Sequence, residues 1–352
     1  MGFIGEVVRK GLSANLKSYS KQVPIPTNFF IFELIKEVRY KSHVCILLAN
    51  YNGEKFIDEQ LKSIEKQNIK NIKIIVSDDE SSDKTISKII KFEKKSRVKV
   101  EFLKTKNSFL FERGHANNFF KLILYAKITD ETKWIAFCDQ DDIWLPNKIS
   151  RAINFLNKNN NYGGYSSSVT AFWGEKSSHI SKVGFLHKYN HFFESAGPGC
   201  TYVLKKEAFL CLKKTLSKNL KFLQNIDYAD WAIYSIVRSN NFLWHIDKVS
   251  SILYRQHSNN AIGIANGLDG YKFRIKKIIN GWYRSQIFWL TLINNCQNII
   301  LIKRIIRLSL FDRFKLFFMA FLVRRKIKDK LILAISCFFM TKIKFPKLGN
   351  EN

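Results

Sequence analysis

The 352-residue sequence lacks the features that mark secreted and disulfide-bonded proteins. Its six cysteines are scattered singly, with no Cys-x-x-Cys pair, and several lie in apolar runs. Isolated cysteines of this kind are typical of reduced core residues and indicate a reducing compartment. The beginning of the chain, MGFIGEVVRKGLSANLKSYSKQ, has no continuous apolar stretch of the kind that forms a signal peptide. We therefore expect a cytoplasmic protein.

Apolar runs long enough to cross a membrane are also missing near the end of the chain. The stretches GWYRSQIFWLTLI, LSLFDRFKLFFMAFLV and KLILAISCFFM are interrupted by basic clusters. None reaches the roughly 20 apolar residues that a spanning helix needs. Two alternatives stay open for these stretches. Basic, aromatic, amphipathic helices can lie in the plane of an anionic membrane surface, or they can pack on the main domain as ordinary helices.

Acidic residues are scarce. The chain has 58 Lys and Arg residues against 29 Asp and Glu residues, a net charge of +29. About half of this excess follows residue 270, where eighteen basic residues face only three acids. Such a charge favours an anionic partner: nucleic acid, lipid headgroups or phosphorylated substrates. No nucleic-acid-binding motif is recognisable, so we expect no nucleic-acid partner.

Between residues 43 and 150, apolar runs alternate with helical patterns. Such alternation predicts an α/β fold with a parallel, doubly wound sheet, whose ligand cleft lies at the carboxyl ends of the strands. Residues 159–199 are rich in Asn, Gly and Ser, which predicts long loops. The predicted strands of the first half are residues 43–49, 72–77, 97–103 and 134–139.

Acidic side chains gather where these strands end. The stretch WIAFCDQDDIWLPNK (134–148) places three aspartates in four positions, and NYNG and DDESSD follow two other predicted strands. In a parallel sheet the three loops converge on one crevice. Like charges in one pocket are costly unless a cation lies between them, which favours a metal site. A solvated acidic turn and a helix-capping cluster remain the alternatives from the residues alone.

Four stretches carry a resemblance to a known family: ILLANYNGEKFIDEQLKSI, IIVSDDESSDKT, FCDQDDIWLPNKI and LYRQHSNNAIG. They resemble the family 2 inverting glycosyltransferases of the GT-A fold, and within them the rhamnosyltransferase-like branch. The resemblance implies a GT-A-type, doubly wound, mostly parallel and Rossmann-like sheet with a basic helical C-terminal extension. We expect a basic leader (1–41), a glycosyltransferase domain (42–270) and a basic amphipathic helical region (271–352). Within the domain, 42–150 would bind the nucleotide sugar and 151–270 the acceptor.

The resemblance implies a nucleotide site and a metal site in the first half. Ala49, Tyr51 and Asp79 would hold the base and ribose, with Asp78 supporting them. Asp139 would lie near the ribose and the metal, and Asp141 would bind the cation. A nucleotide diphosphate leaving group carries charge that a hard cation, Mg²⁺ or Mn²⁺, neutralises through carboxylate oxygens.

The resemblance also implies catalytic groups in the second half. Inversion at a sugar carbon needs one base opposite the leaving group, to take a proton from the acceptor hydroxyl. Asp230 matches the family's base, with Asp227 as a local rival and helix capping as an alternative role for either. Trp231 would line the acceptor site, although a helical Trp is commonly a core residue. Arg255 and His257 would belong to the loop that closes over the diphosphate.

Two departures from the family pattern stand out. The small residue that usually follows the paired aspartates is Glu80 here, which adds charge beside the nucleotide pocket and leaves the assignment of Asp78 and Asp79 uncertain by one position. In GHANNFF the chain keeps Gly114 and Asn118 of the rhamnosyl branch, but His115 has no assigned role.

Together these features predict a glycosyltransferase of bacterial surface polysaccharide synthesis. The expected donor is dTDP-rhamnose and the expected acceptor a lipid-linked saccharide, with the basic C-terminal region on the inner face of the cell membrane. A UDP-hexose donor on the same scaffold is the alternative within the class. A basic nucleic-acid-binding protein and a membrane-docked pseudoenzyme are the alternatives outside it.

Overall fold

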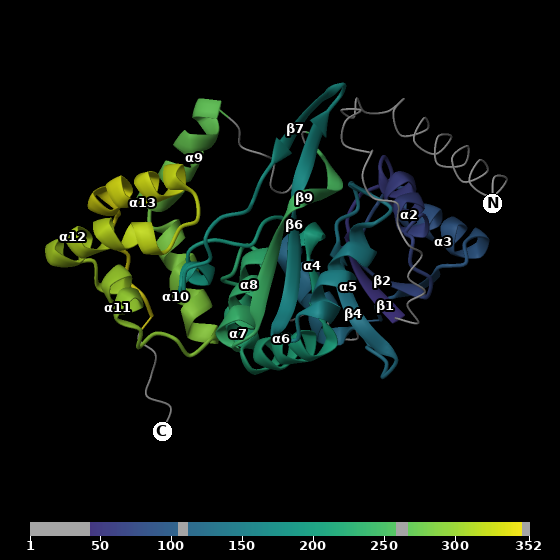
Figure 1. Ribbon diagram of the computed structural model, residues 1–352, viewed down its shortest axis with the longest axis horizontal. Coiled ribbons are helices and arrows are strands. Elements are labelled where there is room, and N and C mark those ends of the chain that lie inside the picture. The colour runs from purple at the N-terminus through teal and green to yellow at the C-terminus, as the bar shows by residue number, and fades with distance from the viewer. Residues whose placement is uncertain (1–42, 105–111, 258–266, 347–352) are drawn as a thin grey trace.

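The computed structural model describes residues 43–104, 112–257 and 267–346. The expected basic leader, residues 1–41, and the end of the LYRQHSNNAIG motif lie outside these ranges. Within them the chain forms one nine-stranded sheet in the order β3-β2-β1-β4-β8-β6-β9-β5, with β7 paired to β6. Figure 1 shows the sheet in the middle of the molecule, with α2 and α3 toward one end and α11 to α13 at the other.

The first half of the sheet is parallel, as the sequence predicts. Strand β1 lies between β2 and β4, and β3 flanks β2, all in parallel register. Alternate residues of β1 face opposite sides: Val44 and Ile46 pack in one core cluster, and Cys45 and Leu47 in the other. A strand buried on both faces explains the continuous apolar runs. The strands are β1 (His43–Asn50), β2 (Ile72–Asp78), β3 (Lys99–Phe102) and β4 (Thr132–Cys138).

Helices cover both faces of this half, as in a doubly wound sheet. Apolar side chains of one group of helices join the cluster that contains Val44, and those of a second group join the cluster that contains Cys45. The first group is α2 (Ile57–Glu65), α3 (Thr85–Lys95) and α5 (Lys148–Lys158); the second is α4 (His115–Tyr125), α6 (Lys206–Lys218), α7 (Leu220–Leu223) and α8 (Ala229–Ser239).

The second half of the sheet is mixed. Strand β8 pairs antiparallel with β4, and β6 runs parallel to β9 but antiparallel to β7 and β8. The short strand β5 extends the sheet by pairing antiparallel with β9. These strands are β5 (Ile143–Trp144), β6 (Tyr162–Trp173), β7 (Lys176–Ile180), β8 (Val203–Lys205) and β9 (Leu243–Arg255), with short 3-10 turns η3 (Asn190–Phe192) and η4 (Gly199–Thr201).

The prediction of long loops over residues 159–199 is wrong for β6 and β7. Small polar residues are buried in β6 because their hydroxyls find partners: Ser166 donates to the Ala196 carbonyl, and Ser167 lies 2.6 Å from the Ser251 hydroxyl. Gly164 is needed for close packing, since a Cβ there would lie 2.2 Å from the Trp244 ring. A composition typical of loops therefore forms a central strand here.

Five helices follow the sheet and share its core. Apolar residues of these helices, including Ile287 and Leu333, belong to the same cluster as α4 and α8. Arg284 is buried and donates hydrogen bonds to the carbonyls of Ile305, Ile306 and Thr341, which ties the helices together. The helices are α9 (Gly267–Ile279), α10 (Trp282–Ile293), α11 (Ile300–Arg307), α12 (Leu310–Met319) and α13 (Ile327–Phe339), with the turn η5 (Ala320–Leu322).

One side of these helices packs on the main domain, which was one of the two alternatives predicted from the sequence. Another side is apolar and exposed. We call this exposed set the apolar face of α12 and α13. No helix within the described ranges is long and apolar enough to cross a membrane. The apolar face consists of Leu310, Phe311, Phe314 and Phe318 of α12, Ile335, Phe338 and Phe339 of α13, and Leu322 of the turn η5 between the two helices.

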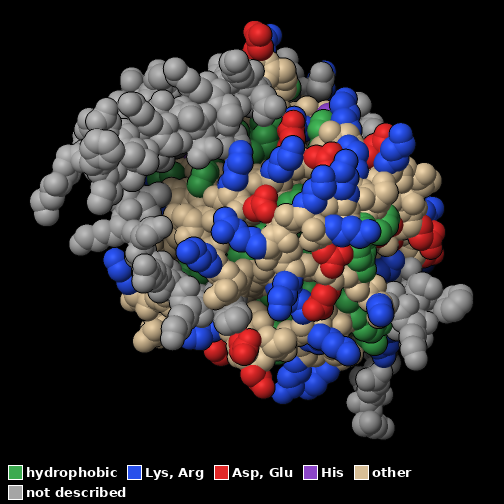
Figure 2. Space-filling model, turned by 90° about the vertical axis from the view of Figure 1, so that its right-hand side faces the viewer, with side chains coloured by type: hydrophobic (Ala, Val, Ile, Leu, Met, Phe, Trp, Pro, Cys, Tyr) green, Lys and Arg blue, Asp and Glu red, His purple; other side chains and the backbone are tan. Residues whose placement is uncertain are grey.

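Basic side chains are not confined to the C-terminal helices. Figure 2 shows the end of the molecule opposite those helices, where Lys and Arg side chains are spread over the surface among fewer Asp and Glu side chains. Helix α3 alone exposes Lys91, Lys94 and Lys95. Part of the net charge is therefore a general property of the surface, and only the local arrangement of charges can indicate a ligand.

Candidate active site

A cavity of about 1160 Å³ extends from the carboxyl ends of β1, β2 and β4 to the C-terminal helices. In the described part of the chain it brings together seven of the ten site residues expected from the sequence: Ala49, Tyr51, Asp79, Asp139, Asp141, Asp230 and Trp231. Asp78, Arg255 and His257 do not line it. The predicted convergence of the three loops is confirmed, because Asn50 pairs with Asp78 and Leu48 with Cys138 in the sheet register.

The two aspartates after β2 have different surroundings. Asp78 accepts hydrogen bonds from the Asn50 amide and from the backbone N–H of Ser81, so its carboxylate stabilises the turn. Asp79 lines the cavity, forms a 2.9 Å ion pair with Lys121 and accepts the backbone N–H of Gly114 at 2.8 Å. The structure thus favours Asp79 as the residue that contacts a ligand, with Asp78 in the supporting position.

Three residues that were not predicted from the sequence contact Tyr51 and Asp79 at this end of the cavity. The Gln140 side chain accepts the backbone N–H of Tyr51 and donates to its carbonyl, both at 2.7 Å, which joins the loops after β1 and β4. Arg113 lies 5.5 Å from the centre of the Tyr51 ring, and Lys121 reaches Asp79 from α4. Only the tertiary arrangement reveals these roles, because the partners are distant in sequence.

Glu80 does not add charge to the cavity. Its side chain is exposed and forms a 3.2 Å ion pair with Arg113, and it is not a lining residue. Its backbone φ is +64°, in the left-handed region where residues other than Gly are disfavoured. This backbone conformation explains why a small residue would suit the position, and the ion pair with Arg113 offsets the charge.

The aspartates after β4 are held by residues from distant elements. Asp139 lies 3.0 Å from the His115 ring nitrogen at the start of α4, and Asp141 lies 3.0 Å from His257 at the end of β9. Asp142 is fully buried and accepts the backbone N–H of Arg255. Burial, with the charges of Asp141 and Asp139, raises the pKa of Asp142 well above its usual value.

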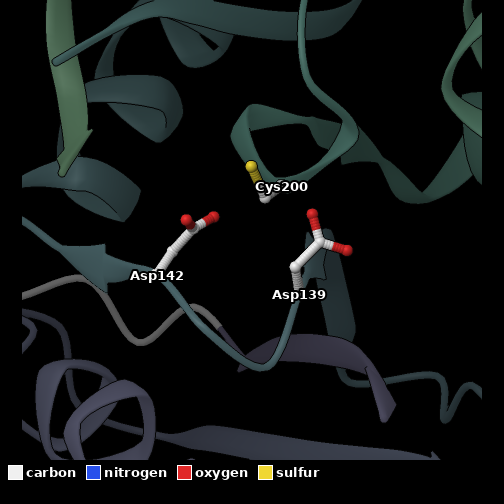
Figure 3. Close-up of side chains that lie close together, drawn as sticks. All are labelled: Asp139, Asp142 and Cys200. Carbon is white, nitrogen blue, oxygen red and sulfur yellow. The ribbon is translucent and has the colours of Figure 1, made fainter. Parts of the chain in front are cut away.

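The carboxylates fit a hard divalent cation. Asp139, Asp142 and Cys200 point toward one another, and their ligand atoms lie within 4.8 Å (Figure 3). Among the residues that the structure describes, one oxygen of the buried Asp142 has no hydrogen-bond partner. Carboxylate oxygens suit Mg²⁺ or Mn²⁺ better than a thiol does. Asp139 and Asp141 line the cavity whereas Asp142 and Cys200 do not, so the first pair is accessible from the cavity.

The structure shows which groups surround His115, the residue without an assigned role in the sequence. Its ring lies beside Asp139, with the carboxylates of Asp230 and Asp141 nearby. Burial disfavours the charged ring, but the hydrogen bond and charge of Asp139 outweigh burial and raise the pKa of His115 above its usual value. The residue therefore lies between the acidic loop and Asp230, a position that its sequence context alone did not reveal.

The structure gives Asp230 and Asp227 different surroundings. Asp230 lies in the first turn of α8 and lines the cavity, whereas Asp227 accepts a hydrogen bond from the Trp282 indole and is not a lining residue. Burial raises the pKa of Asp230 to about 6, against the lowering effect of the Trp231 backbone N–H and His115. A carboxylate with such a pKa is ionised at pH 7 yet is a stronger base than an exposed aspartate.

Trp231 is largely a core residue that also borders the cavity. Its side chain is buried, its indole donates to the His191 carbonyl at 3.0 Å, and its ring stacks on Tyr283 of α10 at 5.7 Å. The ring therefore fixes the start of α8 against the C-terminal helices.

Arg255 and His257 contact the acidic loop but are not lining residues of the cavity. Arg255 donates to the Asp141 carbonyl, pairs with Glu59 of α2 and lies between the rings of Phe56 and Phe172, 4.7 Å from each centre. In this arrangement Arg255 positions the aspartates. Its expected diphosphate contact stays a prediction, as does that of His257.

Comparison with known proteins agrees with these features. Residues 45–202 match the family model described as Glycosyl transferase family 2. The chain is 39% identical over 242 residues to "dTDP-rhamnosyl transferase RfbG" of Shigella flexneri, covering 68% of this chain and 82% of that protein. It is 32% identical to the Escherichia coli "UDP-Glc:alpha-D-GlcNAc-diphosphoundecaprenol beta-1,3-glucosyltransferase WfgD", covering 56% and 71%.

Among solved structures, S. aureus TarS 1-349 in complex with UDP-GlcNAc has a TM-score of 0.45 at 15% identity, covering 80% of this chain and 81% of that chain. The expected fold class, an α/β sheet of the GT-A type with a helical C-terminal region, is confirmed by the family match and the strand order. The chain belongs to glycosyl transferase family 2 and, within that family, is similar to a dTDP-rhamnosyl transferase.

Proposed function

We propose that the protein transfers L-rhamnose from dTDP-L-rhamnose to a lipid-linked saccharide, with inversion at the sugar carbon. The observation that carries the proposal is the position of Asp230 in the same cavity as Asp79, Asp139 and Asp141. The choice of donor is supported by the 39% identity to RfbG, and the choice of acceptor by the similarity to WfgD, whose name specifies a diphosphoundecaprenol-linked substrate.

In the proposed reaction Asp230 acts as the base. An acceptor hydroxyl attacks the anomeric carbon as its proton moves to a carboxylate oxygen of Asp230, and the bond between that carbon and the diphosphate oxygen breaks. The electron pair of this bond leaves with dTDP. The elevated pKa of Asp230 suits proton uptake near neutral pH. A divalent cation held by Asp139 and Asp141 would supply positive charge to the departing diphosphate.

The nucleotide would lie at the ends of β1 and β2. Tyr51 is half exposed in the cavity with Arg113 over its ring, so it offers a face on which a base can stack. The Asp79 carboxylate can accept a hydrogen bond from an N–H at the edge of the base. Lys121 and the Gly114 N–H hold that carboxylate in place.

We also assign the apolar face of α12 and α13 to a membrane surface. Leu310 is 86% exposed and Phe311 is 61% exposed, which is unusual for side chains of this size in such a cluster. The adjoining helix α11 exposes the basic residue Lys303 and contributes Arg304 and Arg307. Apolar side chains beside basic ones match a bilayer with anionic headgroups.

The donor is tested by transfer with the full chain. The enzyme is incubated with Mn²⁺, a lipid-diphosphate-linked saccharide and either dTDP-L-rhamnose or UDP-glucose, and the products are identified by mass spectrometry. We expect a rhamnosylated product. Glucosylation alone would keep the enzyme class and replace the donor by a UDP-hexose, and no transfer from any nucleotide sugar would indicate a pseudoenzyme.

A further inference from the structure

The cavity continues past Asp230 into a strongly basic end. In the described part of the chain this end carries seven Lys and Arg side chains against two carboxylates other than Asp230, those of Glu194 and Asp329. They come from the segment after β7 and from the helices that follow the sheet. The basic lining residues are Lys182, Arg274, Lys277, Arg324, Arg325, Lys326 and Lys328.

Each of the two carboxylates already forms ion pairs with two arginines. Glu194 lies 3.3 Å from Arg325 and 3.8 Å from Arg324, and Asp329 lies 3.8 Å from Arg274 and 3.9 Å from Arg324. Within the described residues, no ion pair neutralises the two lysines Lys182 and Lys326. The basic end therefore keeps an excess of positive charge inside a cavity.

Four of these lining cations, which we call the cationic cluster, lie close enough for the charges of Lys326, Arg274 and Arg325 to act on Lys182. The Arg325 side chain is only 6% exposed, and its Nη1 atom is buried without a hydrogen-bond partner in the described structure. Burial, followed by the charges of Lys326, Arg274 and Arg325, lowers the pKa of Lys182 to about 8. A buried guanidinium nitrogen without an acceptor, among repelling cations, indicates a missing anion.

The cluster lies next to the proposed catalytic base. Arg325 donates a hydrogen bond to the Ser195 carbonyl, and the Ser195 side chain bonds to Asp230. Gly197 packs against Lys182, since a Cβ there would lie 3.1 Å from its Cγ, and a Cβ at Gly199 would lie 3.3 Å from the Asp230 Cβ. The segment 195–199 therefore lines the cavity between the cluster and Asp230, while His115 and Asp139 are charges near Asp230 toward the donor end.

We propose that the cationic cluster binds the diphosphate of the acceptor, on the opposite side of Asp230 from the donor. This inference rests on the proposed function. Arginine presents paired N–H groups that match phosphate oxygens, and lysine adds point charge. The excess of positive charge balances the negative charges of a diphosphate. A saccharide joined to this diphosphate would extend from the cluster toward Asp230.

The chain after the cluster offers a path for the lipid. Helix α13 starts at Ile327, directly after Arg325 and Lys326, and its N-terminus adds a favourable dipole for an anion. Ile327 and Leu331 expose their side chains in its first turns, and the apolar face of α12 and α13 continues from them. A diphosphate held by the cluster would therefore leave its lipid tail beside the surface that we assign to the membrane.

The test is a binding measurement that needs no turnover. Calorimetry follows farnesyl diphosphate binding to the full chain, with the donor site filled beforehand by dTDP and Mn²⁺ and the excess metal removed to limit metal-mediated binding. Inorganic pyrophosphate and farnesol are the companion probes. The test variant is Lys182→Gln with Lys326→Gln; the matched control is Lys91→Gln with Lys94→Gln, two exposed lysines of α3 outside the cavity. Binding of dTDP reports whether each variant is folded.

We expect the cluster variant to weaken farnesyl diphosphate binding at least about tenfold, as loss of charged contacts to phosphate should. The control variant and Lys182→Arg should bind like the wild type. Similar binding of pyrophosphate would assign recognition to the diphosphate alone, and tighter binding of the farnesyl probe would add the lipid. Wild-type protein that binds none of the probes, or equal loss in the control, would overturn the inference. Intact probe binding without sugar transfer would instead reject the proposed function.

Discussion

At the residue scale, the surroundings of Asp230 distinguish it from Asp227. Asp227 precedes α8 and Asp230 lies in its first turn, and from the sequence either residue could be the base. The Asp227 carboxylate is occupied by the Trp282 indole, whereas Asp230 faces the cavity and has its pKa raised by burial. A base for proton transfer needs both access to the substrate and a suitable pKa, and only Asp230 combines them.

The first prediction follows from this difference. Asp230→Asn preserves the size of the side chain but removes its ability to accept the proton, so kcat should fall by at least about a hundredfold. Asp227→Asn should keep most of the activity, because it changes a hydrogen bond outside the cavity. Initial rates with saturating donor and acceptor measure both. Equal losses in the two variants, or an active Asp230→Asn enzyme, would remove Asp230 from the mechanism.

The second prediction concerns pH. With its pKa raised to about 6, Asp230 is a carboxylate above pH 6 and becomes protonated below it. Only the carboxylate can accept the acceptor proton, so kcat should decrease as the pH falls through 6, approaching tenfold per unit at lower pH. A kcat profile from pH 5 to 8 tests this. A profile that is flat across pH 6 would show that the ionisation of Asp230 does not limit the reaction.

At the element scale, the ends of β1, β2 and β4 carry the acidic side of the cavity, where we propose that the nucleotide and metal bind, and the sequence predicts this convergence of loops well. Continuous apolar runs marked these strands, and the polar loops after them had to meet because parallel strands end at one edge. Gln140 and Arg113 escaped prediction because their partners, Tyr51 and Glu80, are adjacent only after folding.

Strand β6 shows why the second half was harder to predict. Its run of serines has the composition of a loop, yet Ser166, Ser167 and Ser168 are fully buried, with hydroxyls that hydrogen-bond to partners on other segments. Arg255 was expected at the diphosphate because of its motif. The observed contacts with Glu59 and the acidic loop depend on tertiary packing that no local pattern encodes.

The third prediction belongs to α12. Replacing Phe311, Phe314 and Phe318 together by Ser should weaken binding to phosphatidylglycerol vesicles by at least about tenfold, because each buried Phe contributes about 1.5–3 kcal/mol. Vesicle sedimentation measures the partition. The matched control replaces Ile90 and Leu210, exposed apolar residues on α3 and α6, by Ser.

Unchanged vesicle binding in the Phe variant would contradict the membrane assignment. Sedimentation velocity without lipid provides the other decisive outcome. A wild-type dimer that the three Ser substitutions convert to a monomer would show that a second copy of the chain covers this face.

At the scale of the whole molecule, the cavity has two ends of opposite character. Acidic groups, Asp79, Asp139 and Asp141, gather at the sheet end, where a metal-loaded nucleotide would bind, and the basic lining residues gather at the end formed by the C-terminal helices. Asp230 lies between them. This polarity is consistent with an acidic site in a chain with a net charge of +29: in the proposed function the two kinds of charge would serve different substrates.

The most direct test of this account is the thermal stability of the purified full chain with dTDP-rhamnose, dTDP or UDP-glucose, with and without Mn²⁺. A ligand that binds the folded state raises Tm, by an amount that grows with its concentration relative to Kd. We predict an increase with dTDP-rhamnose that requires Mn²⁺ and disappears in Asp141→Ala. An equal increase without metal would contradict the metal role of Asp141, and no increase with any nucleotide would contradict the nucleotide-sugar site itself.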